Sequence, residues 1–389
     1  MIKRALVTVA VGALAACTDT LPPITGTTSL EITLVTPADP GDIDNRLDAS
    51  MHAVVVNVQA KDVNGENDAS YSKDVQVYVH FLGTLSPYLD AAPVATFTVT
   101  NGVAMNQHLT LPNVFGPTTI WFDDHKSPDA TYATGISPTL WFRDPYIADI
   151  QTPTSETALD ALSNSPLNGK NISVDGSKYG ANGRLVVTSV FAQGYTVADV
   201  QCGAGGTPPC TSQPYDFVEV FSFSAPTDQH ARFLSEGQVI AGFAGGISEF
   251  NGLTEIGFPQ TFVGGEPDVD KAREPATVVL DSTWFSNKIL FERNEAGAIE
   301  IDGGVVCPLD ADYTTYKQWK IDPTGVGDAA ACGGRNLINV ITAGVVDIDP
   351  GTLVGKVVPK IVGILRPVNI GSFNVWIIYP RSSADLTTN

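Results

Sequence analysis

The chain is short of positive charge. Its 389 residues include 22 Lys and Arg against 42 Asp and Glu, which gives a formal net charge of −20. Such an acidic surface repels phosphate backbones and anionic lipid headgroups at long range. It also lacks the excess of basic residues that broad phosphate binding needs. The composition therefore argues against a general nucleic-acid-binding protein.

Histidine and the common catalytic motifs are equally scarce. The five histidines form no i, i+4 pair and no HExxH pattern. The segment 245–248 lacks the closing glycine of a Gly-x-Ser-x-Gly nucleophile turn, and no phosphate-binding or dinucleotide fingerprint is present. We therefore expect a protein that is not an enzyme and has no cofactor and no metal. His80 lies inside an apolar segment and is predicted to be a core or edge histidine.

Two acidic segments leave one metal alternative open. Asp42, Asp44 and Asp48 lie in one segment, and Asp347 and Asp349 lie in another. Calcium needs six to eight oxygen ligands, and neither segment has the spacing of an EF-hand. Solvated loop carboxylates are the preferred interpretation.

Long apolar runs are absent, and the short run at 5–16 follows Lys3 and Arg4. It is too short to cross a bilayer as a helix and is typical of a secretory signal. The sequence Leu14-Ala15-Ala16-Cys17 resembles the lipobox of bacterial lipoproteins. That resemblance implies cleavage before Cys17, acylation of its thiol and attachment to a membrane. An ordinary signal peptide with an incidental cysteine is the alternative.

Cleavage before Cys17 sets the charge and the expected location of the mature chain. It removes Lys3 and Arg4 and no acidic residue, leaving 20 basic and 42 acidic side chains and a charge of −22. Because Thr18 rather than Asp follows the cysteine, the lipoprotein resemblance implies the outer membrane of the bacterial cell envelope. The membrane leaflet stays open.

Cysteine is rare, with only four left after Cys17. An even number in an exported chain favours disulfides. Of the three possible pairings we prefer Cys202–Cys210 and Cys307–Cys332, because each pair brackets one glycine-rich loop. A zinc site is the alternative, but it requires tighter spacing or nearby histidines, and His230 stands alone.

What the chain has in abundance is turn residues and β-branched residues. It contains 36 Gly and 26 Pro, and Val, Thr and Ile recur in short bursts such as 51–60 and 75–81. Helical periodicity is nearly absent, so we predict an all-β fold. The one expected helix is 156–163, within a polar connector at 148–167.

The first β region resembles bacterial immunoglobulin-like (Ig-like) domains. The resemblance is carried by Val54-Val55-Val56-Asn57-Val58-Gln59-Ala60-Lys61-Asp62-Val63-Asn64-Gly65 and by Val75-Gln76-Val77-Tyr78-Val79-His80-Phe81. It covers about 29–147, after a signal at 1–17 and a tether at 18–28, and it departs from the pattern at Glu66. It implies a β-sandwich that serves as a stalk, spacer or adhesive module.

The rest of the chain resembles oligonucleotide/oligosaccharide-binding (OB) barrels that accompany some secreted bacterial endonucleases. The resemblance is carried by 193–199 (QGYTVAD) and 246–256 (GISEFNGLTEI). It implies a Greek-key barrel at 168–268, and the region 269–389 repeats the plan with strands expected at 297–306, 313–321, 337–343, 353–365 and 372–379. A single larger β-domain over 168–389 is the alternative.

Aromatic residues in the predicted barrels are the candidate binding residues. In OB barrels the faces of strands 2 and 3 grip extended chains by stacking. Residues in or beside the corresponding strands are Tyr195, Tyr215, Phe217, Tyr313, Tyr316 and Trp319. Packing in the core is the alternative for each of them.

These observations predict a non-enzymatic, lipid-anchored protein that binds a partner protein or an extended polymer such as a glycan. A nucleic-acid-binding OB protein that works with a secreted nuclease is a second hypothesis, which the charge of the chain disfavours. A hydrolase with an unrecognised carboxylate site is a third.

Overall fold

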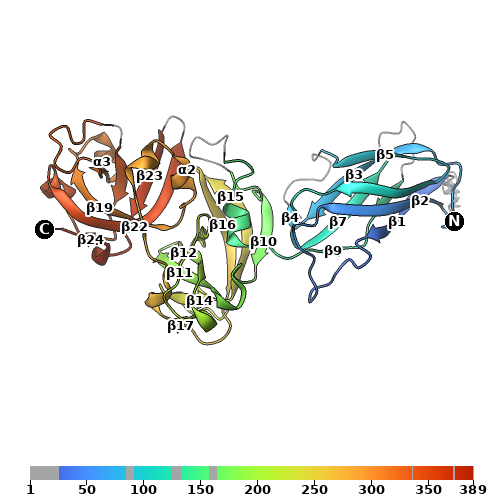
Figure 1. Cartoon of the computed structure of the whole chain (residues 1–389), viewed down its shortest axis with the longest axis horizontal. Helices are drawn as coiled ribbons and strands as arrows, with labels where there is room; N and C mark the ends of the chain where they lie inside the picture. The colour runs from blue at the N-terminus through green and yellow to red at the C-terminus, as the bar shows by residue number, and fades with distance from the viewer. Residues whose placement is uncertain are drawn as a thin grey trace, which may run out of the picture.

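The computed structural model describes residues 26–84, 92–124, 133–156, 164–334, 336–370 and 373–388. Within these residues the chain is all β, as predicted, with three successive sheets along the long axis of the molecule (Figure 1). The signal, Cys17, nearly all of the tether, His125 and the expected helix beyond Glu156 lie outside the described residues.

The first sheet is a two-layered sandwich. β1 pairs antiparallel with β2 and parallel with β8, so it joins the β2–β6 layer to the β8–β7–β3–β5 layer. The order across this first sheet is β5–β3–β7–β8–β1–β2–β6, with β9 paired to β7. Its strands are β1 (Thr27–Thr36), β2 (Ala53–Asp62), β3 (Lys73–Phe81), β5 (Ala95–Val99), β6 (Val103–Thr110), β7 (Pro117–Asp123), β8 (Thr134–Ile136) and β9 (Leu140–Trp141).

Alternation along β2 builds the core of the sandwich. Val54, Val56, Val58 and Ala60 are fully buried, while the residues between them are partly exposed. Successive side chains of a strand point to opposite faces, so this period of two places one apolar face inward. His80, on β3, is half-buried, with its ring centroid 4.9 Å from that of Trp121.

The second sheet is barrel-like and has nine strands in the order β17–β14–β11–β12–β13–β16–β15–β10–β4. β11, β12 and β13 form an antiparallel meander, β13 pairs parallel with β16, and β15 joins β16 to β10. The strands are β10 (Lys170–Val174), β11 (Gly183–Phe191), β12 (Gly194–Gln201), β13 (Phe217–Phe221), β14 (Gln238–Ile240), β15 (Gly242–Phe250), β16 (Leu253–Phe262) and β17 (Asp268–Val269).

Two contacts attach the sandwich to the barrel formed by the second sheet, which we call the second barrel. The short strand β4 (Gly83–Thr84) pairs with β10 at the edge of the second sheet (Figure 1). Helix α1 (Ile147–Gln151) buries Ile147 and Ile150 in the core of the second barrel, together with Phe115 of the sandwich.

The third sheet closes on itself. The order β19–β20–β21–β23–β22 returns to β19, and β21 pairs parallel with β23. Among the described residues no strand pairing connects it to the second sheet. Its strands are β18 (Val278–Val279), β19 (Ala298–Val306), β20 (Gln318–Asp322), β21 (Ile338–Ile341), β22 (Val357–Ile370), β23 (Phe373–Tyr379) and β24 (Leu386–Thr387), beside helices α2 (Ile289–Glu292) and α3 (Ala311–Tyr316).

One predicted strand is wrong in its first half. The segment 313–321 was expected to be extended throughout, but its first residues belong to α3 and only β20 is a strand. The side chain of Asp310 accepts hydrogen bonds from the backbone N–H groups of Asp312 and Tyr313, which caps the helix. Lys317, at φ 59°, then ends it in the left-handed region.

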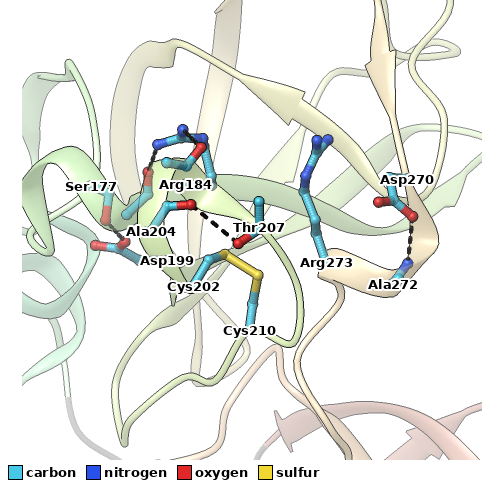
Figure 2. The surroundings of a disulfide bond; sticks show 12 residues. Ser177, Arg184, Asp199, Cys202, Ala204, Thr207, Cys210, Asp270, Ala272 and Arg273 are labelled. Atoms are coloured by element: carbon cyan, nitrogen blue, oxygen red, sulfur yellow. Dashed lines mark hydrogen bonds between the residues drawn. A yellow bond between two sulfur atoms is a disulfide. The ribbon is translucent and has the colours of Figure 1, made fainter.

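The preferred disulfide pairing is confirmed. Cys202 bonds to Cys210 across the loop between β12 and β13, and Cys307 bonds to Cys332 after β19. Figure 2 shows the first bond beside Arg184, whose Nη2 donates to the carbonyl of Gly205 at 2.6 Å. Ser177, in the segment before β11, donates to Asp199 of β12, so that segment is fixed to the sheet close to the same disulfide.

Candidate functional site

Three of the six predicted binding aromatics are core residues. Tyr195 is 0% exposed, Trp319 is 1% exposed and Phe217 is 3% exposed. The hydroxyl of Tyr195 hydrogen-bonds to that of Thr261, and Trp319 Nε1 donates to Thr342 Oγ1. Their rings present no face to a ligand. For these three residues the alternative interpretation, packing in the core, is therefore the correct one. The sequence located the strands but not the face on which each ring lies.

The other three predicted aromatics do not form one surface. Tyr215 is buried, and its hydroxyl donates to Glu156, which also pairs with Arg293 at 2.6 Å. This contact joins the connector to the part of the chain that forms the third sheet, which we call the third unit. Tyr313 is half-buried against the third core, whereas Tyr316 is 62% exposed at the end of α3.

The exposed aromatic cluster of the second barrel consists of three other phenylalanines. The ring centroids of Phe221 and Phe223 lie 4.5 Å apart, and those of Phe223 and Phe258 lie 5.0 Å apart. Phe223 is 55% exposed and Phe258 is 82% exposed. Both have positive φ, 58° and 52°, which is rare for a bulky residue and costs free energy.

These rings border a groove of about 530 Å³ on the outer surface of β15 and β16. Glycines form part of its lining. Gly245 leaves no room for a larger residue, because a Cβ atom there would lie 2.6 Å from Ile256 Cγ2. We call this the aromatic groove; its lining residues with aromatic or hydrogen-bonding side chains are Asn171, Phe221, Phe223, Ser248, Glu255, Phe258 and Gln260. The sequence signal for it was the Phe-Ser-Phe run at 221–223, at the end of a predicted strand.

A row of polar side chains crosses the barrel beside the groove. In register, Thr196 faces Glu219, Glu219 faces Glu255, and Glu255 faces Ser248 on four neighbouring strands. Paired neighbours point to the same side of a sheet, so the two carboxyls share the outer face of the barrel. The inner face of β13 carries Val218 and Val220, which belong to the barrel core.

Glu219 is fully buried because the third unit covers it. Arg366 of β22 donates from Nη2 to Glu219 Oε1 at 2.6 Å, and Glu219 Oε2 has no hydrogen-bond partner. Burial raises the pKa of Glu219 to about 7, with Arg366 acting in the opposite direction. Burial also raises the pKa of the half-buried Glu255.

A second cavity, of about 320 Å³, lies at this junction between the two barrels. We call it the junction cavity; its lining includes Phe191, Glu219, Arg366, Tyr379 and Arg381. The guanidinium carbon of Arg366 lies 5.6 Å from the ring centre of Phe191 and 5.2 Å from that of Tyr379. Glu219 is thus one of the residues around the junction cavity, and its neighbour Glu255 is one of those around the aromatic groove.

The acidic segments that suggested calcium form local turns. Asp42 accepts hydrogen bonds from the backbone of Asp44 and Asn45, and Asp349 accepts one from Gly351. In the part of the chain that the structure describes, no three His, Cys, Asp or Glu side chains are placed to hold a metal ion. Across the same residues, no helix has the length and apolar character to cross a bilayer.

Comparison with known proteins leaves the family open. No protein-family model matches the chain, and no curated protein matches it. A search of solved structures returns the dimeric latent PorU from Porphyromonas gingivalis, at 12% identity and a TM-score of 0.21. That match covers 90% of this chain and 34% of the PorU chain. Similarity at this level carries no argument about fold or function.

Proposed function

We propose that this protein is a lipid-anchored binding module of the bacterial cell envelope, and that its second barrel holds an extended glycan in the aromatic groove. The observation that carries the proposal is the exposed cluster of Phe223 and Phe258 at the border of the groove. Strained backbone is retained where function requires it, and here it holds two apolar rings in solvent.

The chemistry of the lining supports a glycan as the ligand. Aromatic faces stack on the C–H faces of sugar rings, while amide, hydroxyl and carboxyl groups bind the sugar hydroxyls. Asn171, Ser248, Glu255 and Gln260 supply those groups. No Lys or Arg is among the described lining residues, which disfavours a phosphodiester backbone as the ligand.

The anchor and the sandwich complete the proposal. Cys17 would carry the lipid, and several acyl chains would make release from the outer membrane negligible. The sandwich would act as a stalk that holds the barrels away from the membrane. Mass spectrometry of the N-terminal peptide checks the anchor: an acylated Cys17 supports it, and an unmodified N-terminus contradicts it.

Affinity electrophoresis and calorimetry against a panel of soluble polysaccharides test the groove. We expect Phe223→Ala with Phe258→Ala to weaken binding at least tenfold, about 1.4 kcal/mol, because both stacking faces are lost. Phe250→Ala is the matched control, since Phe250 is 59% exposed and lies outside the described lining of the groove. Unchanged binding by the double variant, or no binding to any polysaccharide, would overturn the proposal.

A further inference from the structure

The junction cavity contains a carboxyl oxygen that the protein leaves without a partner. Glu219 Oε1 accepts from Arg366, whereas Oε2 is buried and has no donor. Such an arrangement is unfavourable, because the oxygen has lost its water without gaining a hydrogen bond. Glu219 lines the cavity, so a molecule bound there is placed to supply the missing donor.

Arg366 provides complementary groups beside this oxygen. Its planar guanidinium carries five N–H donors in a fixed fork, and only Nη2 is used by Glu219. The ring centres of Phe191 and Tyr379 lie 5.6 and 5.2 Å from its guanidinium carbon. A carboxyl acceptor next to a guanidinium donor matches two adjacent hydroxyls of a sugar, of which one donates and the other accepts.

The size of the cavity limits what it can hold. Its volume of about 320 Å³ is close to the lower end of ligand cavities, roughly 300 Å³. This space suits one sugar unit and not a length of polymer. Because Glu219 and Glu255 are paired in register, the cavity lies directly beside the aromatic groove.

We propose that the junction cavity binds a terminal sugar unit of the glycan, with one hydroxyl donating to Glu219 Oε2 and the adjacent hydroxyl accepting from Arg366. This inference rests on the proposed function, because the following units of the same chain would occupy the aromatic groove. It deepens that function: the protein recognises the end of a glycan chain.

The charges around the cavity disfavour an anionic ligand. Arg381 also lines the cavity, but its guanidinium already pairs with Asp385 and Glu274. Arg366 therefore faces two carboxyls, Glu219 and Glu255, which leaves no excess of positive charge for an anion. A neutral polyol, such as a sugar, requires no excess of positive charge for binding.

Free hexoses, titrated into the purified full chain by calorimetry and saturation-transfer NMR, are the probe. The panel is glucose, galactose, mannose and N-acetylglucosamine, each with deoxy analogues that lack one hydroxyl of a vicinal pair. We expect at least one hexose to bind with a Kd on the order of 1 mM, as suits a single weakly held unit. Its matching deoxy analogue should bind at least fivefold more weakly.

Two variants locate the hexose. Glu219→Gln keeps the shape of the side chain and removes the carboxylate, and we expect at least a fivefold loss of affinity. Ala343→Trp leaves the Glu219–Arg366 pair intact and fills the cavity from its exposed rim, which should abolish binding. Ala272→Trp is the matched control, because Ala272 is also exposed and is outside the described lining.

The outcomes separate this inference from the proposed function. Hexose binding that survives Phe223→Ala with Phe258→Ala, but is lost in Ala343→Trp, supports the cavity even if no polysaccharide binds. No hexose binding at tens of millimolar, or equal binding by Ala343→Trp and Ala272→Trp, would overturn the inference while leaving the polymer result to judge the groove.

Discussion

Glu219 lies in the middle of β13 with its carboxyl removed from water and one guanidinium beside it. Taking a carboxylate and a guanidinium out of water costs several kcal/mol per ion, and their attraction offsets this only in part. Burial correspondingly favours the neutral acid, which is why its pKa is raised to about 7. Glu249 and Glu255 are raised in the same direction by burial, and Glu295 is raised well above its ordinary value.

These raised pKa values predict a protein that is more stable in mild acid than at neutral pH. An unfolded glutamate releases its proton near pH 4.5, whereas folded Glu219 keeps it to about pH 7. Between these values the folded state holds more protons, so the free energy of unfolding falls as pH rises.

We expect a higher Tm at pH 5 than at pH 7.5, measured by calorimetry at constant ionic strength. Glu219→Gln does not titrate and should show a smaller difference between the two pH values. Glu266→Gln is a suitable control, because the Glu266 side chain is 95% exposed. A Tm that rises from pH 5 to pH 7.5 would contradict the expected sign.

At the scale of elements, the short bursts of β-branched residues predicted strands well and predicted their surroundings poorly. The segment 51–60 overlaps most of β2, in which Val54, Val56 and Val58 are buried and the residues between them are partly exposed. In β13 both faces are buried, one in the barrel core and one under the third unit. A strand-like sequence therefore identifies the strand, but it does not show whether the face away from the barrel core is exposed to solvent or buried under another unit.

The two disulfides differ in the length of chain that they close, and this predicts different effects on stability. Loop-closure entropy gives about 2.5 kcal/mol for the separation of 8 residues and about 3.5 kcal/mol for that of 25. We expect Cys307→Ser with Cys332→Ser to lower the denaturant midpoint more than Cys202→Ser with Cys210→Ser. Chemical denaturation of the two double variants checks the order, and the reverse order would refute the entropic account.

At the scale of the molecule, the second and third units are joined by charged side chains that come from distant parts of the chain. Arg381 donates to the carbonyl of Thr188 at 2.8 Å and to Glu274 at 2.8 Å, and it also pairs with Asp385. One side chain thus connects β11, the segment before β18 and the C-terminal region.

Removing this side chain should weaken the junction strongly. Arg381→Ala leaves Glu274 and Asp385 largely buried without their partner, and breaking a buried pair costs about 3–5 kcal/mol. We expect a clear fall in the denaturant midpoint and faster proteolysis between the two barrels. Lys271→Ala removes an exposed pair with Glu236 and should cost about 0–1 kcal/mol. Equal losses in the two variants would show that Arg381 does not hold the junction.

The sequence by itself determined the all-β class and the order of the strand-rich regions, because these depend on local bursts of β-branched residues and on turn residues. It favoured the observed pairing of the four cysteines over two other pairings but did not determine it. The tertiary structure alone decided which aromatics are exposed. Tyr195 and Trp319 are strand residues whose side chains are buried in a core. Phe223 and Phe258 are exposed and have positive φ, and the sequence periodicity predicts neither property. It also brought Glu219 and Arg366 together across 147 residues. Such a contact depends on how two barrels pack, and packing is a property of surfaces rather than of any segment.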